Sequence, residues 1–277
     1  MSSTFEGRKA IAHDTIARSE SVAQSVPGAS LDSVFFEQQI PADSLPAPGP
    51  DAYHCTVKVI NSDSFTAARG IIRESPNAEG KTAVLNLASD EEPGGGWVET
   101  LSRTQEEALC YSSTLYATLK PSYYPWDNTG PNSIKGVYSS SIVIFKDDLD
   151  HDCIDLPREE WKLVSVITVA APRLPRLIKI GNGEYNFKNE EDVDNLREKI
   201  KLVYRMAIKH NQEYIVLGAM GCGAYGCPPR RVAEEMKVLL LDPEFRGRFR
   251  EIVFAVYSTK YNSNFKVFSE VFDGVDV

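Results

Sequence analysis

The chain has 277 residues and a formal net charge of −9, and its apolar and charged fractions are ordinary for a soluble globular protein. This length fits one large domain, or one domain with a terminal extension. The acidic charge argues against broad non-specific binding of a polyanion, so we expect no direct DNA binding. No stretch is long and apolar enough to span a bilayer, and the polar N-terminus argues against a signal peptide.

Five scattered cysteines suit a reducing compartment, so we expect an intracellular protein of the cytoplasm, the nucleus or both. Cys222 and Cys227 lack the cysteine or histidine partners of a zinc site, so we expect no bound metal. Histidine catalysis has little support, because no histidine lies beside a glycine-rich segment: the four are His13, His54, His151 and His210.

In chain order, a polar helix is predicted over about residues 6–23 and a long Pro-, Ser- and Ala-rich connection over 26–51. Short apolar runs then alternate with helical patterns. Strands are predicted at Cys55–Ile60, Thr82–Leu87, Val137–Phe145, Leu163–Ala170, Tyr214–Leu217 and Glu251–Tyr257. Helices are predicted at Ser64–Arg73, Thr104–Leu119, Glu190–His210, Pro229–Leu241 and Asn264–Phe272, and loops at Lys120–Gly136 and Pro172–Asn189.

Strands that alternate with helices predict an α/β sandwich around a mostly parallel sheet. We expect residues 1–50 to form a helix and an extended connection packed on a main domain of residues 51–277. Ligands of such sheets bind beyond the carboxyl ends of the strands. Two glycine-rich segments, Gly94–Gly96 and Gly218–Gly226, follow strands, so we expect both at one edge and in one site.

A triple glycine and a pair of glutamates form the most informative motif. Gly94–Gly96 is a backbone without side chains that can take positive φ and lie against a ligand; a mobile surface loop is the alternative. Eight residues later, Gln105–Glu107 opens a predicted helix. Adjacent helical side chains point about 100° apart, so we expect one carboxylate to act as an acid and the other as a positioning group. Thr104 with Glu107 also matches a capping box, which leaves a purely structural role open.

The second glycine-rich segment, Gly218–Gly226, has four glycines between a predicted strand and a predicted helix. This arrangement fits a phosphate cradle, since the helix opened by Pro228 and Pro229 favours an anion at its N-terminus. The spacing matches neither the dinucleotide-binding fingerprint nor a Walker loop. Tyr225 could stack on a sugar or a base, and a tight turn with a packed tyrosine is the alternative.

Two polar residues at the predicted strand ends extend this candidate site. Asp63 can cap the helix that follows it, or accept a hydrogen bond from an adenine amino group. Asn86 can pin the loop that follows its strand, or hold a ribose hydroxyl. The sequence pattern leaves both pairs of alternatives open.

Together these residues resemble the microbial-type poly(ADP-ribose) glycohydrolases, a branch of the macrodomain fold. The resemblance rests on Gly94–Gly96, the eight-residue spacing and Gln105–Glu107, and it continues in Asn61–Ser64, Asn86–Ala88 and Gly218–Gly226. It implies a three-layer α/β/α macrodomain-like sandwich with a mixed, mostly parallel central sheet and an N-terminal helical extension.

The resemblance also implies an activity: hydrolysis of ribose–ribose O-glycosidic bonds that releases ADP-ribose, without a cofactor or a metal. Glu107 would be the general acid and base, and Glu106 would hold ribose hydroxyls. Asp63 would contact the adenine, and Tyr225 the distal ribose. The candidate substrate-binding residues are Asp63, Asn86, Gly94, Gly95, Gly96, Gln105, Gly221, Cys222, Gly223, Ala224, Tyr225 and Gly226.

The chain departs from the family pattern at Ser89, Arg173 and Cys227, each of which stands where an asparagine is common. Loss of these amides would change the affinity or the preferred linkage. Two alternative functions follow, a mono-ADP-ribosyl-protein hydrolase and a non-catalytic ADP-ribose-binding macrodomain. The expected partners are poly(ADP-ribose) or ADP-ribosylated proteins, with ADP-ribose as the product.

Overall fold

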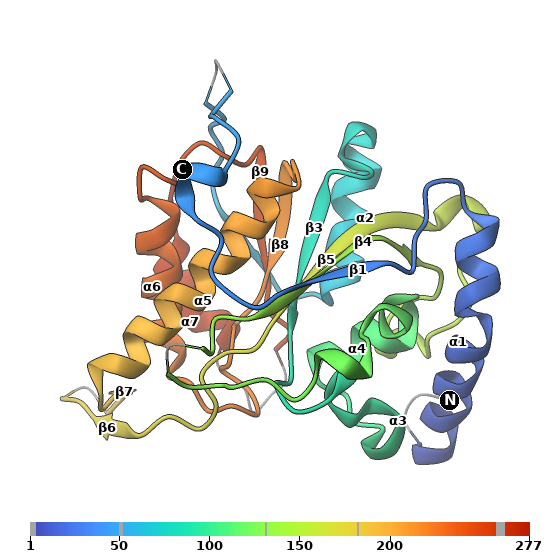
Figure 1. Cartoon of the computed structure of the whole chain (residues 1–277), viewed down its shortest axis with the longest axis horizontal. Coiled ribbons are helices and arrows are strands. Elements are labelled where there is room, and N and C mark those ends of the chain that lie inside the picture. Colours follow the sequence, from blue (N-terminus) through green and yellow to red (C-terminus); the bar gives the residue numbers. More distant parts are fainter. Residues whose placement is uncertain (1–3, 50–51, 131, 182, 259–263) are drawn as a thin grey trace.

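The computed structural model describes residues 4–49, 52–130, 132–181, 183–258 and 264–277, and its centre is a seven-stranded sheet (Figure 1). The strand order is β1-β4-β5-β3-β8-β9-β2, and only β4 runs opposite to the other six. The predicted mixed, mostly parallel sheet is therefore confirmed. Its strands are β1 (Ser33–Phe36), β2 (Lys58–Ile60), β3 (Thr82–Leu87), β4 (Gly136–Ile144), β5 (Lys162–Val169), β8 (Tyr214–Leu217) and β9 (Glu251–Ala255).

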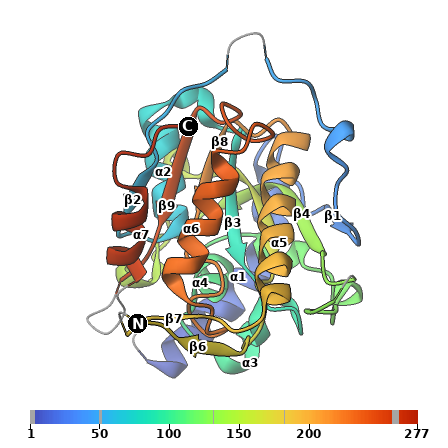
Figure 2. The ribbon, with the colours of Figure 1, turned by 90° about the vertical axis from the view of Figure 1, so that its left-hand side faces the viewer.

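Helices cover both faces of this sheet (Figures 1 and 2). In the central strand β3, Ala83 and Leu85 pack with α5, α6 and α7, while Val84 packs with α1, α2 and α4. Alternate residues of a strand point to opposite faces, so an unbroken apolar strand of this kind needs cover on both sides. The result is the predicted three-layer sandwich. Its helices are α1 (Phe5–Ser25), α2 (Ser64–Glu74), α3 (Trp97–Thr100), α4 (Gln105–Ser112), α5 (Glu190–Lys209), α6 (Pro229–Leu240) and α7 (Asn264–Phe272).

The N-terminal segment is more than a helix and a connection. β1 lies within the predicted extended connection and pairs with the first residues of β4 as an edge strand, which the sequence pattern did not predict. The Thr15 hydroxyl on α1 donates to the carbonyl of Tyr111 on α4 at 2.8 Å, which joins α1 to the helix that carries both glutamates. The predicted boundary falls at Pro50 and Asp51, which lie outside the described residues.

Two other predictions need correction. The helix predicted to reach Leu119 ends at Ser112, because the next residues turn to meet β4: Ser113 bridges to Ile144, and a short 3-10 helix follows. The predicted loop over 172–189 contains a two-stranded antiparallel ribbon apart from the main sheet, made of β6 (Leu177–Lys179) and β7 (Tyr185–Phe187). In the loop predicted over 120–136, Pro131 lies outside the described residues.

The parallel strands β3, β5, β8 and β9 end at the same edge of the sheet. Both glycine-rich segments leave the sheet there, as do the residues between β2 and α2. No helix in the part of the chain that is described has the length and apolar character needed to cross a membrane.

Candidate active site

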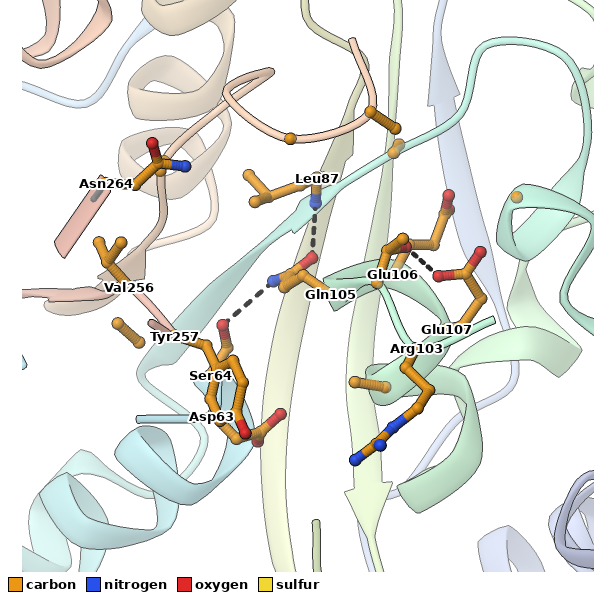
Figure 3. A pocket seen from close by; sticks show the side chains of 18 of the residues that line it. Asp63, Ser64, Leu87, Arg103, Gln105, Glu106, Glu107, Val256, Tyr257 and Asn264 are labelled. Atoms are coloured by element: carbon orange, nitrogen blue, oxygen red, sulfur yellow. Dashed lines mark hydrogen bonds between the residues drawn. The ribbon is translucent and has the colours of Figure 1, made fainter. Parts of the chain in front are cut away.

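A cavity of about 590 Å³ opens at the carboxyl edge of the sheet, a size typical of small-molecule sites. Its walls come from the segments that follow β2, β3, β8 and β9 and from the first turn of α4 (Figure 3). Nine predicted site residues line it: Asp63, Gly95, Gln105, Glu106, Glu107, Gly221, Gly223, Ala224 and Tyr225. Five lie beside or behind the lining: Asn86, Gly94, Gly96, Cys222 and Gly226.

The triple glycine forms a left-handed turn directly against the two glutamates. Its three φ angles are +63°, +63° and +70°, a conformation that glycine adopts far more readily than other residues. A Cβ on Gly95 would lie 3.2 Å from a carboxylate oxygen of both Glu106 and Glu107. A Cβ on Gly96 would lie 2.8 Å from a Glu92 oxygen. The glycines are therefore needed so that the backbone can approach the carboxylates.

The protein holds Glu106 by both carboxylate oxygens. The backbone N–H of Ser89 donates to one at 2.7 Å, and the Asn86 amide donates to the other at 3.0 Å. The side chain is buried, and this burial raises the pKa of Glu106 to about 8, with a further contribution from the charge of Glu107. Burial thus favours the neutral form of Glu106, and the two hydrogen bonds fix its orientation.

Glu107 is held by only one of its oxygens. The Thr104 hydroxyl donates to Oε2, while Oε1 faces Gly95 and the cavity and has no hydrogen-bond partner in the described part of the chain. The Thr104 side chain makes no capping bond to the backbone of α4, so the predicted capping box does not form. The two adjacent carboxyl groups thus differ: Glu106 is held by hydrogen bonds to both oxygens, whereas Glu107 has one oxygen without a partner among the described residues.

Gln105 and Asn86 hold this arrangement from behind. The Gln105 amide donates to the carbonyl of Leu85 at 2.7 Å and to Ser64 at 3.1 Å, and its oxygen accepts the N–H of Leu87 at 2.9 Å (Figure 3). Asn86 is fully buried and donates to Glu106 and, at 3.2 Å, to Thr168. Of the two roles considered for Asn86, the structure shows the structural one. Both amides position the first turn of α4 on the end of β3.

The second glycine-rich loop presents backbone donors to the cavity. Gly223, Ala224 and Tyr225 line the cavity, and their backbone N–H groups have no acceptor within the described residues. Gly221 has φ +74°, and a Cβ there would lie 2.5 Å from that of Ala171, so the loop packs tightly on the segment after β5. Successive unpaired N–H groups in a turn are able to bind an anion, so the phosphate cradle stays a prediction for this loop.

Asp90 is a site residue that the sequence pattern did not reveal. The Tyr225 hydroxyl donates to the Asp90 carboxylate, and the Asp90 N–H donates back to the Tyr225 oxygen at 3.1 Å. Burial, together with this carboxylate, raises the pKa of Tyr225. Arg173 approaches Asp90 at 3.5 Å and pairs with Glu91. Its partners Tyr225 and Arg173 lie far along the chain, so no local pattern predicts their contact with Asp90. The one nearby indication of a role in the site is that Asp90 closely follows Asn86–Ala88.

Of the three departures from the family pattern, only Ser89 lines the cavity. Cys227 is buried behind the loop, where its thiol donates to the carbonyl of Pro172 at 3.1 Å. Arg173 lies outside the lining and joins the Asp90 network. A changed contact with a ribose therefore concerns Ser89 first.

The opposite end of the cavity carries Asp63, with Val256, Tyr257 and Asn264 beside it (Figure 3). Asp63 Oδ1 accepts the N–H groups of Phe65 at 2.8 Å and Thr66 at 3.0 Å, so it caps α2 and lines the cavity at once. Burial raises its pKa to about 6, and nearby aspartates add to the effect. The helix-cap role of Asp63 is thus confirmed.

The described residues contain one group with the spacing of metal ligands, Asp147, Asp148 and His151. These side chains already have partners: Asp147 pairs with Arg69, and Asp148 accepts from His151 and from Thr66. The group therefore forms a hydrogen-bonded cluster at the rim, and it lacks a free set of ligands for a metal.

Comparison with known proteins agrees with this geometry. Residues 13–147 match the family model of the microbial-type PARG catalytic domain. The crystal structure of poly(ADP-ribose) glycohydrolase (PARG) from Thermomonospora curvata is 30% identical, with a TM-score of 0.76; the alignment covers 96% of this chain and 99% of that one. The PARG from Deinococcus radiodurans in complex with ADP-ribose is 26% identical, with a TM-score of 0.72 and coverage of 93% and 98%. None of the curated proteins compared with the chain matches it. The chain belongs to the family of microbial-type poly(ADP-ribose) glycohydrolases.

Proposed function

We propose that the chain is a poly(ADP-ribose) glycohydrolase that hydrolyses ribose–ribose O-glycosidic bonds and releases ADP-ribose, with Glu107 as general acid and base. The observation that carries this proposal is the unpaired Oε1 of Glu107, which faces the cavity beside Gly95. Structures of the Deinococcus radiodurans protein with ADP-ribose and of the Thermomonospora curvata protein with the inhibitor ADP-HPD support the substrate class.

The reaction uses one titrating carboxyl group twice. Protonated Glu107 gives its proton to the leaving 2′-oxygen as the glycosidic bond breaks and the ribose becomes oxocarbenium-like. The resulting carboxylate then takes a proton from the water that attacks the anomeric carbon, which restores the acid. The usual glycosidase scheme needs two catalytic carboxylates, whereas here the substrate's own diphosphate helps to stabilise the cation.

Glu106 serves this chemistry as a positioning group. Burial raises its pKa to about 8, which favours its neutral form. Its orientation is fixed by Ser89 and Asn86, so it can hold ribose hydroxyls in a constant place. The adenine lies at the Asp63 end, the diphosphate on the free N–H groups of the second glycine loop, and the distal ribose against Tyr225.

The test is the variant Glu107→Gln, which keeps the shape of the side chain and removes the titrating acid. We expect release of ADP-ribose from poly(ADP-ribose) to fall by about a hundred- to ten-thousandfold, while calorimetry shows ADP-ribose binding close to that of the parent. Glu106→Gln is the matched control for a lost carboxyl group at the adjacent position. Turnover by the Glu107→Gln variant at the parental rate would refute the assignment.

The same assay separates the alternative functions. A mono-ADP-ribosyl-protein hydrolase would release ADP-ribose from a singly modified protein and leave the polymer intact. A non-catalytic reader would bind ADP-ribose and release nothing from either substrate. We also propose an intracellular location, in the cytoplasm or the nucleus, which the five free cysteines support.

A further inference from the structure

The β6–β7 ribbon exposes apolar and cationic side chains together. Tyr185 is 56% exposed and Ile178 is 47% exposed. Arg176, Lys179 and Lys188 are exposed as well, and none of them makes an ion pair with a described residue. Three unpaired cations thus lie on or beside this small element, and the one acid between residues 176 and 188, Glu184, pairs with Arg230. Exposed apolar groups on a ribbon with unpaired cations indicate a surface for an anionic ligand with apolar parts.

Pairing within the ribbon strengthens this interpretation. Lys179 lies opposite Tyr185 in the ladder, so an ammonium group and an exposed ring share one face. At the other end, the Lys188 N–H donates to the carbonyl of Arg176 at 2.8 Å, which brings two like charges to opposed positions. Like charges directly opposite one another destabilise a ladder, and a bound anion would remove that repulsion.

The ribbon adjoins the loop that lines the cavity. The N–H of Leu174, just before the ribbon, donates to the carbonyl of Tyr225 at 2.9 Å. Glu184, just before β7, pairs with Arg230 in the first turn of α6 at 2.8 Å. Figure 2 shows β6 and β7 beneath the N-terminal ends of α5 and α6. A polymer whose end is held in the cavity therefore passes within reach of the ribbon.

We propose that the β6–β7 ribbon is a second binding site for poly(ADP-ribose), which holds polymer outside the cavity. This inference rests on the proposed function. Arg176, Lys179 and Lys188 contact diphosphates, and an adenine stacks on Tyr185. Cationic side chains combined with an exposed aromatic ring are the usual means of holding a flexible, single-stranded chain of phosphates and bases. Because the cavity already holds one unit, even weak contacts here add affinity through a high local concentration.

The test compares long poly(ADP-ribose) with a dimer of two ADP-ribose units, the shortest substrate that contains the scissile bond. The variant carries Arg176→Glu, Lys179→Glu and Lys188→Glu. Its control carries Arg73→Glu, Lys209→Glu and Arg246→Glu, which change the net charge by the same amount. These three exposed residues lie before the amino ends of β3, β8 and β9, at the edge of the sheet opposite the cavity. Tyr185→Ala removes the stacking ring, and Tyr185→Phe keeps it.

We expect the ribbon variant to lose about tenfold or more in kcat/KM on the long polymer and to keep the parental value on the dimer. For the long polymer, the slope of log(kcat/KM) against log salt concentration should become shallower by about 2. Each cation that neutralises a phosphate contributes roughly 0.7 to this slope, and the variant lacks three such cations. Tyr185→Ala should lose about tenfold on the long polymer, and Tyr185→Phe should stay close to the parent.

Equal losses on dimer and polymer, or equal losses in the ribbon variant and its control, would overturn the second site. A ribbon variant with the parental kcat/KM on both substrates would also overturn the second site. The ribbon would then be a surface for another protein. These failures differ from failure of the proposed function, in which the unmodified chain itself releases no ADP-ribose from either substrate.

Discussion

The left-handed glycine turn gives a prediction in which the catalytic effect of a single methyl group can be separated from its effect on folding. Gly95 has φ +63°, and the Cβ of Gly95→Ala would lie 3.2 Å from Glu106 Oε2 and from Glu107 Oε1. Gly80 has a similar φ of +73°, but a Cβ there would meet nothing within 4 Å. Both substitutions force alanine into the left-handed region, which costs about 1–2 kcal/mol.

We therefore expect Gly95→Ala and Gly80→Ala to lower the melting temperature by similar amounts, a few degrees each. Their activities should differ sharply. The methyl group at position 95 must push two carboxylates by a few tenths of an ångström, and small misplacements of reacting groups lower rates by roughly 10- to 100-fold. Gly80→Ala should keep the parental kcat/KM.

The assay is initial-rate release of ADP-ribose from poly(ADP-ribose), with thermal unfolding measured on the same preparations. A Gly95→Ala variant with parental kcat/KM would refute the idea that the turn sets the carboxylate positions. An equal loss of activity in Gly80→Ala would also refute it, since that result would trace the effect to stability alone.

Three further outcomes are expected. The pKa of Asp63 is raised to about 6 from 3.8, so ionisation of this carboxyl lowers the stability of the folded state as pH rises from about 4 to 6. Asp63→Asn keeps both capping bonds on Oδ1. Urea unfolding should show this variant about 1–2 kcal/mol more stable than the parent at pH 7 and equally stable near pH 3.5. A gain in stability that persists at pH 3.5 would contradict this. Tyr225→Phe leaves Asp90 without its hydroxyl donor, so the KM for the polymer should rise about tenfold. The control Tyr257→Phe, at the exposed rim, should change this KM less than twofold. Equal effects of the two substitutions would argue against a fixed Tyr225. Dialysis against a chelator should leave kcat unchanged, and activity restored only by added metal would show that a metal takes part.

Much of the fold could be predicted from the sequence because its signals are local. The apolar run of β3 predicts a buried strand, and the apolar residues at helical spacing in α5 predict a helix. The predicted bounds of β3, β8 and α7 match those observed. The failures concern elements whose structure depends on distant partners. β1 is a four-residue edge strand in a Pro- and Ser-rich segment and is defined by its pairing with β4. The helix α4 ends early because Ser113 meets Ile144.

The site shows the same division. The glycine turn and the two glutamates lie within 14 residues, so their association could be predicted from spacing. Helix geometry indicates that the two glutamate side chains point in different directions. It does not indicate which of them the protein holds, because the hydrogen bonds to Glu106 come from Asn86 and Ser89, before the glycine turn. The pairing of Asp90 with Tyr225 spans 135 positions, and no local pattern reveals it.

The short edge strand β1 has a consequence for aggregation and for shortened forms of the protein. The two outer strands of the sheet, β1 and β2, have four and three residues, whereas β4 and β5 have nine and eight. Short edges offer little unpaired backbone for a second chain to join. A chain that starts after residue 50 would lose β1 and leave the backbone of β4 at Gly136–Ser139 without its partner strand. This exposed edge could then pair with a second chain, so we expect the shortened form to self-associate more readily than the full chain.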